Sequence, residues 1–239
     1  MICLTKLRRA LSGGPLAGLV VAAAQLACAC GPRDATPVPE PPALQADKLI
    51  APTSVASITS TAIEITAEPG AATPGALVEF TNLDTTDLPV VSTVRADGSF
   101  SVRILPVGEL RAVVIAGARR SKPLDFSFVG PSIVTTERPA CLVVTPGLVT
   151  GARAGATTRF TLTNSCSGPV TLSNVRTRLN PSQLAPELAA SPSIAPGSSA
   201  DISIALSANL APTEDEVVFV DAAVEGEPVR YPLSVYVDE

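Results

Sequence analysis

Residues Val90 to Ile104 read VVSTVRADGSFSVRI, and this stretch decides the class of fold. Val90–Arg95 is rich in β-branched residues, and Phe100–Ile104 alternates apolar with polar residues. Ala96-Asp97-Gly98-Ser99 lies between them, and an Asp-Gly pair between two such runs is a strong signal for a β-hairpin, because glycine accepts the positive φ angles of tight turns. The stretch therefore predicts two strands joined by a hairpin turn.

The same signals recur along the rest of the chain. Phe160/Leu162 and Ile202/Ile204/Leu206 show the two-residue period of half-buried strands. The N-terminal half contains no stretch of useful length with a helical period. The sequence thus predicts an all-β protein with two antiparallel β-sandwich domains in tandem. Further strands are expected at Ala76–Thr81, Leu110–Ile115, Leu124–Phe128, Cys141–Thr145, Thr158–Asn164, Val170–Val175, Ala200–Ser207, Glu216–Val224 and Arg230–Val237.

The first 29 residues have the pattern of an export signal. Lys6, Arg8 and Arg9 form a short positive region, and an uncharged apolar stretch follows from Ala10 to Ala29. Such a segment is a targeting element and is set aside when the fold is considered. We therefore expect residues 1–29 to be a signal peptide.

The end of this segment, Leu26-Ala27-Cys28-Ala29-Cys30-Gly31, resembles the bacterial lipobox. The resemblance implies that a cysteine becomes lipidated and anchors the protein to a membrane of the cell envelope. Cys30 fits the small, apolar surroundings better than Cys28, which follows Gln25-Leu26-Ala27 and remains the alternative. Ordinary secretion after cleavage near these residues, or an uncleaved anchor, are the other possibilities. Gly31 after the lipid site carries no inner-membrane retention signal of the enteric type, which favours the outer membrane in a two-membrane organism.

Composition then divides the chain into four parts. Residues 30–48 contain five prolines and little apolar material, so we expect a Pro-rich tether that lifts the folded part off the membrane. Residues 49–137 and 138–239 are the two expected sandwich domains. Pro131–Pro139 is the expected joint between them.

Turn and strand motifs in the first domain resemble the bacterial Ig-like modules of surface proteins. The matching residues are Glu68-Pro69-Gly70, Pro74-Gly75-Ala76-Leu77-Val78, Asp97-Gly98-Ser99-Phe100 and Gly108-Glu109-Leu110. The resemblance covers about residues 58–128. It implies a seven-strand sandwich with a spacer or adhesive role.

The second domain resembles the Hydin-like immunoglobulin-fold family, relatives of the major sperm protein. The resemblance implies an Ig-like sandwich used for binding and scaffolding, without catalytic residues. The chain departs from the family after Ala208, where Asn209–Pro212 replaces the usual turn. The matching pieces are Leu142–Pro146, Phe160–Asn164, Pro169–Leu172, Ile194–Ser199 and Val229–Val235.

Two cysteines remain in the second domain, Cys141 and Cys166. An even pair in an exported domain suggests a disulfide. The midpoint between them falls inside Gly151–Gly155, so two strands that reverse there would bring the cysteines together. Two buried free thiols are the alternative.

Composition argues against catalysis and against several classes of partner. The chain has no histidine and no tryptophan, and loss of Lys6, Arg8 and Arg9 would leave 14 basic against 22 acidic residues. Such an acidic surface does not attract nucleic acid. Without histidine a serine nucleophile lacks its usual base, and the acidic run Glu214–Glu216 suits a solvated loop. Asp84 and Asp87 lie in an expected loop and are a poor metal set. We therefore expect no enzyme, no cofactor and no metal site.

The expected function is that of a lipid-anchored cell-envelope protein, acting as a non-catalytic binding, adhesion or structural module. Its partners would be the membrane, through the N-terminal lipid, and a protein of the envelope. The alternative is an accessory lipoprotein that binds an envelope polysaccharide or extracellular glycan. That alternative is weakened because sugar sites favour exposed aromatic side chains, and the only tyrosines, Tyr231 and Tyr236, lie in an expected strand.

Overall fold

The computed structural model describes residues 41–51, 62–105, 107–179, 183–188, 193–209 and 215–237. Within these ranges the chain forms β-strands and a short 3-10 turn, Ala46–Lys48, and no α-helix. Residues Pro39–Glu239 form one compact unit. The predicted all-β fold is confirmed.

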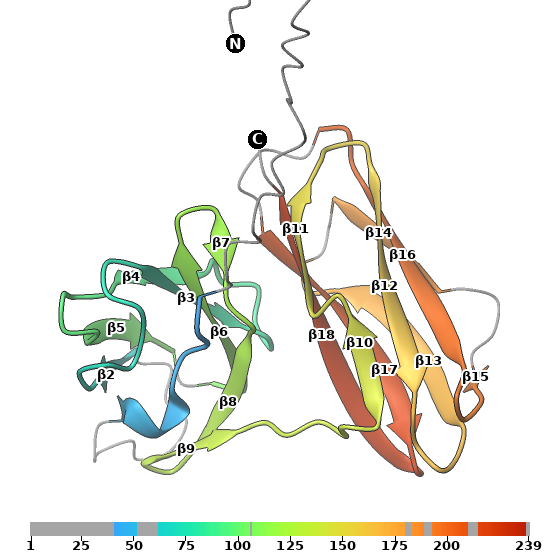
Figure 1. The fold of residues 1–239 in the computed structure, drawn as a ribbon, viewed down its shortest axis with the longest axis horizontal. Helices are drawn as coiled ribbons and strands as arrows, with labels where there is room; N and C mark the ends of the chain where they lie inside the picture. Colours follow the sequence, from blue (N-terminus) through green and yellow to red (C-terminus); the bar gives the residue numbers. More distant parts are fainter. Residues whose placement is uncertain are drawn as a thin grey trace, which may run out of the picture. The chain divides into compact units, whose positions relative to one another are not determined.

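The first β-sandwich contains strands β1 to β9. One sheet has the order β1-β2-β5, and the other has the order β4-β3-β6-β8-β9, with β7 paired to β6 (Figure 1). Side chains from both sheets share one hydrophobic cluster, in which Phe80 lies 5.9 Å from Phe100 and 6.4 Å from Phe126 between ring centroids. The strands are β1 (Leu49–Ile50), β2 (Ile63–Ala67), β3 (Leu77–Asn82), β4 (Val90–Thr93), β5 (Phe100–Ile104), β6 (Glu109–Ala116), β7 (Arg119–Arg120), β8 (Leu124–Val129) and β9 (Ser132–Thr135).

The predicted Asp-Gly turn is present, but the hairpin is not. The N–H of Arg95 donates to Ser99 O at 2.8 Å, and that of Gly98 to Arg95 O at 2.9 Å. Gly98 has φ +85°, and a Cβ there would lie within 2.9 Å of the backbone of Gly70 and Ala72, so the turn needs glycine. The strands then enter different sheets, β4 beside β3 and β5 beside β2. This separation brings Phe100 on β5 against Phe80 on β3 across the core.

Two expected boundaries of the first domain need correction. Pro131–Pro139 is not simply a joint, because β9 lies within it and pairs with β8, from Phe126↔Thr135 to Val129↔Ser132. The expected tether also reached too far. Leu44 is buried in the first hydrophobic cluster, and the N–H of its neighbour Gln45 donates to Ala71 O at 3.1 Å.

The second β-sandwich contains strands β10 to β18 in two sheets, ordered β10-β12-β16-β14 and β11-β18-β17-β13-β15. All strand pairs in it are antiparallel except β11 with β18, which is parallel. The long strands of the two sheets form separate layers (Figure 1). The strands are β10 (Leu142–Thr145), β11 (Leu148–Ala152), β12 (Thr157–Asn164), β13 (Val170–Thr177), β14 (Leu184–Leu188), β15 (Ser193–Ile194), β16 (Ser199–Leu206), β17 (Asp215–Val224) and β18 (Glu227–Val237).

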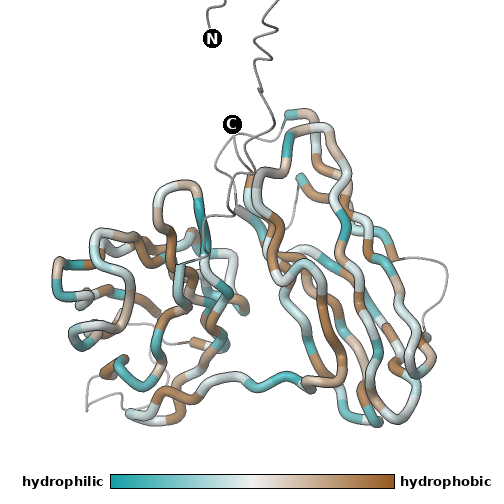
Figure 2. The backbone as a smooth tube through the Cα atoms, in the orientation of Figure 1, coloured by the Kyte–Doolittle hydropathy of each residue, from teal (hydrophilic) through white to brown (hydrophobic). Residues whose placement is uncertain are grey.

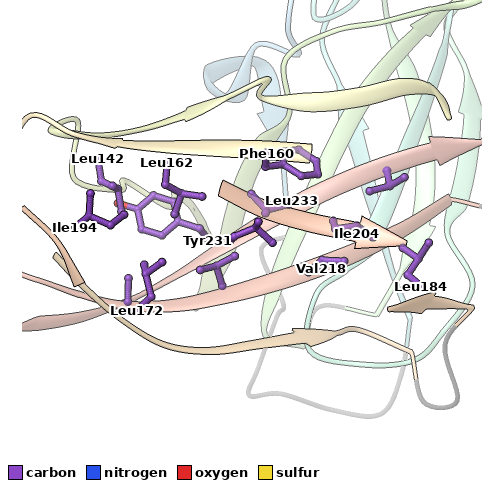
Figure 3. Packing of buried hydrophobic residues seen from close by; sticks show 14 of the residues in the cluster. Leu142, Phe160, Leu162, Leu172, Leu184, Ile194, Ile204, Val218, Tyr231 and Leu233 are labelled. Atoms are coloured by element: carbon purple, nitrogen blue, oxygen red, sulfur yellow. The ribbon is translucent and has the colours of Figure 1, made fainter. Parts of the chain in front are cut away.

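The core of the second sandwich follows from the predicted alternation. Phe160 and Leu162 on β12 and Ile204 on β16 point from one layer towards Val218 and Leu233 of the other (Figure 3). Along β12 and β16, buried apolar residues alternate with less buried, mostly polar residues (Figure 2). Burial of one face of each sheet is what holds the two layers together.

The expected reversal between the cysteine-bearing strands is only partly correct. β10 and β12 pair as expected, with Leu142 opposite Asn164. However, residues Leu148–Ala152 form β11, which crosses to the other sheet and pairs with β18. The tight turn therefore lies after β11, where the N–H of Ala156 donates to Arg153 O at 3.0 Å.

Candidate functional site

Strands β6 and β18 are buried on both faces. On β6, Leu110 and Val114 belong to the core of the first sandwich, yet Arg111 on the opposite face is also buried. On β18, Leu233 belongs to the second core, and Ser234 on the opposite face is buried as well. Nη1 of Arg111 donates to Oγ of Ser234 at 2.7 Å, so the second faces of these two strands cover each other.

An ion pair lies at the centre of this interface. Arg111 on β6 and Asp125 on β8 are directly opposed in the strand register. Nε and Nη2 of Arg111 donate to Oδ1 and Oδ2 of Asp125 at 2.7 and 2.8 Å. This two-point geometry is the strong form of the arginine–carboxylate contact.

Arg138, in the segment that joins the sandwiches, contacts both of them. Its Nη1 donates to Asp125 and its Nη2 to Glu109, each at 2.5 Å. Its Nε donates to the main-chain oxygen of Arg230 on β18 at 2.9 Å. One side chain therefore links two carboxylates of the first sandwich to the backbone of the second.

Arg230 extends the network across the same interface. Its Nη1 donates to Oδ1 of Asp84 at 2.6 Å, and its Nη2 donates to Oε2 of Glu109 at 2.9 Å. Three arginines (Arg111, Arg138, Arg230) thus meet three carboxylates (Asp84, Glu109, Asp125). The charges balance within the cluster.

The position of Asp84 depends on a glycine. Oδ2 of Asp84 accepts the N–H of Glu109 at 2.7 Å. Gly108 precedes that amide with φ +68°, and a Cβ there would overlap the Asp84 carboxylate. Gly108 therefore leaves the space in which Asp84 can reach Glu109 and Arg230 together.

The surroundings hold two of these carboxyl groups in their charged form. Burial alone would raise the pKa of Asp125, but the hydrogen bonds and charges of Arg111 and Arg138 lower it overall. Burial likewise opposes the lowered pKa of Asp84, which results from Arg230, the N–H of Glu109 and the charge of Arg176. The anionic form of both carboxyl groups is therefore stabilised.

An apolar contact accompanies the charged network. Leu83 of the first sandwich clusters with Val217 and Phe219 of β17. The guanidinium carbons of Arg176 and Arg230 lie 4.6 and 4.8 Å from the centre of the Phe219 ring. Arginines placed over an aromatic face gain a cation–π attraction, so Phe219 supports the arginine that binds Asp84.

A further cation–π contact lies elsewhere in the same interface. Arg120 of β7 lies over the ring of Tyr236 of β18, 4.0 Å from its centre. The contacts between the sandwiches therefore extend from the loop after β3 to the turn after β6.

The charged groups of this interface bind one another. Arginine has no accessible neutral form at ordinary pH, and the carboxyl groups whose pKa values are shifted are held as anions. A general acid would need a raised pKa and access to a substrate. The arrangement suits a structural role between two rigid elements.

The predicted disulfide is present between Cys141 and Cys166, with their Cα atoms 4.7 Å apart. The N–H of Cys166 donates to Oδ1 of the buried Asn164 at 2.8 Å, and the N–H of Ser165 donates to Cys141 O at 2.7 Å. The paired strands β10 and β12 therefore bring the two cysteines together. Cys28 and Cys30 lie outside the described residues, and their lipidation stays a prediction.

Asp84 and Asp87 lie in the loop between β3 and β4, as expected, and both have specific partners there. Asp84 is bound by Arg230, and Oδ2 of Asp87 accepts the Thr85 hydroxyl at 2.8 Å. Glu216 is buried at the start of β17, which corrects the expectation of a solvated loop. In the described part of the chain, no group of three or more acidic or cysteine side chains is placed to hold a metal ion.

A small cavity lies at the side of the first sandwich, away from the ion pairs. Its volume is about 130 Å³, and Phe80, Val90, Ile104 and Leu110 contribute to its lining. Val90 lies on β4, which is the last strand on that side of its sheet. Both Val90 and Val91 of this strand are exposed.

The interface between the sandwiches is not predicted from the sequence, although the sequence carries a signal for it. Residues Ala112–Ile115 and Val217–Val220 are continuous apolar runs instead of alternating ones. Strands covered on both faces have this composition. What the sequence does not show is that the two runs cover one shared interface.

None of the helical segments within the described ranges is long and apolar enough to cross a bilayer.

No family model matches the chain, and no curated protein matches it significantly. Similar solved structures include WR4, a C. elegans MSP family member, at 9% identity over 41% of this chain and 99% of that one, with a TM-score of 0.35. VesB protease of Vibrio cholerae is 12% identical over 69% of this chain and 62% of that one, with a TM-score of 0.38. A protein of unknown function from Porphyromonas gingivalis W83 is 13% identical over 81% and 98%, with a TM-score of 0.31.

Proposed function

We propose that the chain is a lipid-anchored cell-envelope protein whose two sandwiches serve as a non-catalytic binding, adhesion or structural module. The first sandwich is then a bacterial Ig-like module and the second a Hydin-like Ig-fold domain. Cys30, or alternatively Cys28, carries the lipid, and the Pro-rich segment after it is the tether.

The observation that carries this proposal is the closed interface between the sandwiches. Arg138 binds Asp125 and Glu109 of the first sandwich and the main chain of β18 in the second. Its partner Asp125 is buried and held as an anion. A module that presents surfaces at a fixed geometry needs such a joint, whereas a catalyst needs reactive groups that a substrate can reach.

Binding of an extended polypeptide at the edge of β4 is the mode that we favour. Val91 on this strand is 50% exposed, and Leu88 before it is 84% exposed. An edge strand offers unpaired backbone groups to an added strand, and exposed side chains beside it give specificity. The partner is then an envelope protein with an extended apolar segment.

The aromatic side chains give no support to the glycan alternative. Tyr231 and Tyr236 are buried in β18, and each of the six phenylalanines is buried or half-buried. Sugar recognition by stacking needs an exposed ring. Retention of the purified protein on an envelope polysaccharide column would nevertheless reinstate this alternative.

The anchor and the partner are tested together in cells of the native organism. The full chain carries a C-terminal tag, membranes are fractionated, and captured proteins are identified by mass spectrometry after cross-linking. Cys30→Ala removes the expected lipid site, and Cys28→Ala is the matched control. We expect acylation, membrane partitioning and a defined partner in the wild type and in the control, and none of the three in Cys30→Ala.

The contribution of β4 is tested with a second matched pair. Val91→Lys places a charge on the edge of β4, and Val143→Lys does the same on β10, an edge strand of the second sandwich where Val143 is 45% exposed. Loss of the partner in Val91→Lys alone would support binding at β4. Equal capture by both variants would rule out this edge, and acylated Cys30→Ala would rule out Cys30 as the anchor.

A further inference from the structure

The loop between β3 and β4 is folded back on its own sandwich by Asn82, the last residue of β3. Oδ1 of Asn82 accepts the N–H groups of Asp84 and Thr85 at 2.9 and 3.2 Å, and its Nδ2 donates to Val107 O at 2.8 Å. These bonds hold the start of the loop to its own sandwich. The main-chain oxygens of Asn82, Thr85 and Asp87 accept hydrogen bonds from outside the first sandwich.

Those oxygens are bound by an arginine of the second sandwich. Arg178 follows β13 directly, and its own N–H donates to Val217 O of β17 at 2.8 Å. Its Nη1 donates to Thr85 O at 2.9 Å and to Asp87 O at 3.0 Å, with Asn82 O at 3.5 Å. Three main-chain oxygens, one from the last residue of β3 and two from the loop, therefore surround one nitrogen.

Arg178 also needs the loop, because its side chain is buried. The side chain of Arg178 is buried, and its Nε has no hydrogen-bond partner within the described residues. Burial lowers the pKa of Arg178, although the charges of Glu216, Asp87 and Glu79 oppose this. If the loop moved away, a buried cation would lose its main hydrogen-bond acceptors, which is costly.

Neighbouring contacts place the same loop against the same sandwich. Leu83 packs with Val217 and Phe219, and Asp84 binds Arg230. On its other side the loop contributes Asp87 and Leu88 to the lining of the cavity beside β4. The loop thus lies between the second sandwich and the cavity of the first.

We propose that Arg178 holds the β3–β4 loop against the second sandwich. The second sandwich then sets the conformation of this loop, and with it one wall of the cavity in the first sandwich. The inference goes beyond the function above, because it does not depend on what the protein binds or on how it is anchored. It makes Arg178 a positioning residue that acts from one sandwich on the other.

Hydrogen exchange with mass spectrometry on the full chain tests this tie. Arg178→Met removes the guanidinium and keeps a long side chain. The amides of Leu83, Asp84 and Thr85 are hydrogen-bonded in the wild type, and we expect peptides that contain them to exchange at least ~10-fold faster in the variant, because their opening needs less free energy. Peptides from β2 and β5 should change little.

Arg159→Met is the matched control, since Arg159 also lies in the second sandwich but pairs with Asp201 at an exposed site, 3.2 Å away. It should leave exchange in the β3–β4 loop unchanged. Arg178→Lys keeps the charge with a single nitrogen and should fall between Arg178→Met and the wild type. Faster exchange near Arg178 with an unchanged β3–β4 loop would overturn the proposal.

A measurement on the wild type covers the case in which Arg178→Met does not fold. Exchange at increasing urea gives the opening free energy of each protected amide. The amides of Leu83 and Arg178 both donate to main-chain oxygens, and the tie requires that they open with the same urea dependence. A loop amide that opens independently, with an opening free energy far below that of the Arg178 amide, would refute the tie.

Discussion

Arg111 and Asp125 face each other directly across β6 and β8, and their side chains are only 5% and 4% exposed. A surface pair in the same register would contribute little to stability. Here the same pair also joins the sandwiches, because Arg111 donates to Ser234 and Asp125 accepts from Arg138. The pair therefore couples strand register in one sandwich to docking of the other.

Asp125→Asn should be strongly destabilising, because it leaves Arg111 buried without its counter-charge. Breaking one partner of a buried pair costs about 3–5 kcal/mol, which urea unfolding of the full chain would measure. Asp201→Asn is the control, since Asp201 and Arg159 are 39% and 66% exposed and such pairs contribute about 0–1 kcal/mol. Equal losses in the two variants would contradict the structural role of the network.

Stability should fall in acid and stay nearly level around neutral pH. The pKa values of Asp84 and Asp125 are lowered in the folded protein by their arginine partners, against the opposing effect of burial. Their contribution is therefore complete above the unfolded value of about 3.9 and is lost as the pH falls through the lower folded values. The chain has no histidine to titrate between these regions and neutrality.

The urea midpoint measured between pH 2 and pH 8 checks this expectation. It should be level above about pH 5 and decline steeply below about pH 4. A midpoint that rises on acidification would mean that these carboxyl groups are destabilising in the folded protein.

Gly108→Ala should cost more than the positive φ angle alone explains. Both Gly108 and Gly117 have positive φ, +68° and +62°, but only at Gly108 would a Cβ meet Asp84. Gly117→Ala should lose about 1–2 kcal/mol from backbone strain. Gly108→Ala should lose a further ~1–3 kcal/mol from crowding, since Asp84 must leave Glu109 or Arg230. Similar unfolding free energies for the two variants would show that the position of Asp84 is unimportant.

Removal of the disulfide should destabilise the second sandwich. Cys141 and Cys166 are 25 residues apart, and a loop of this length corresponds to about 3–4 kcal/mol in the chain-entropy model. Cys141→Ala/Cys166→Ala should show this loss in urea unfolding followed by tyrosine fluorescence, because both tyrosines lie on β18. Reduced wild type should behave like the double variant. No loss in either would assign the stability to strand packing alone.

Much of the fold was predictable because a strand buried on one face has apolar residues at every second position. Phe160/Leu162 and Ile202/Ile204 mark β12 and β16 in this way, and both pairs lie in the second core. Short strands contain too few residues to show this period. Leu148–Ala152 contains a glycine and overlaps the expected reversal, whereas it pairs with β18 as β11.

The Asp97-Gly98 turn shows a different reason for failure. Local residues decide that the chain turns there, and the bonds between Arg95 and Ser99 confirm it. They do not decide whether the flanking strands pair with each other. That depends on Phe80 and Phe100, which pack across the core from strands in opposite sheets.

The disulfide was predictable from the sequence, but the candidate site at the interface between the sandwiches was not. Two cysteines that flank a reversal in a domain expected to be exported favour a disulfide, because exported proteins fold in oxidising compartments, and Cys141 and Cys166 are bonded in the structure. The arginines of the interface give no comparable signal, because a charged residue in a strand is most often solvated. Arg178 and its three carbonyl partners lie more than ninety residues apart in the chain.

The sequence by itself determined the secondary structure class and most strands, because alternation and turn residues act over short stretches of chain. It favoured a disulfide between Cys141 and Cys166 over two free thiols, and the structure contains that disulfide. The tertiary structure alone decided which sheets the strands join and that the sandwiches dock through Arg111, Asp125, Arg138 and Arg230. The physical reason is range. Burial of a charge becomes favourable only where several distant segments supply its partners at once. No local sequence pattern indicates which distant segments will come together.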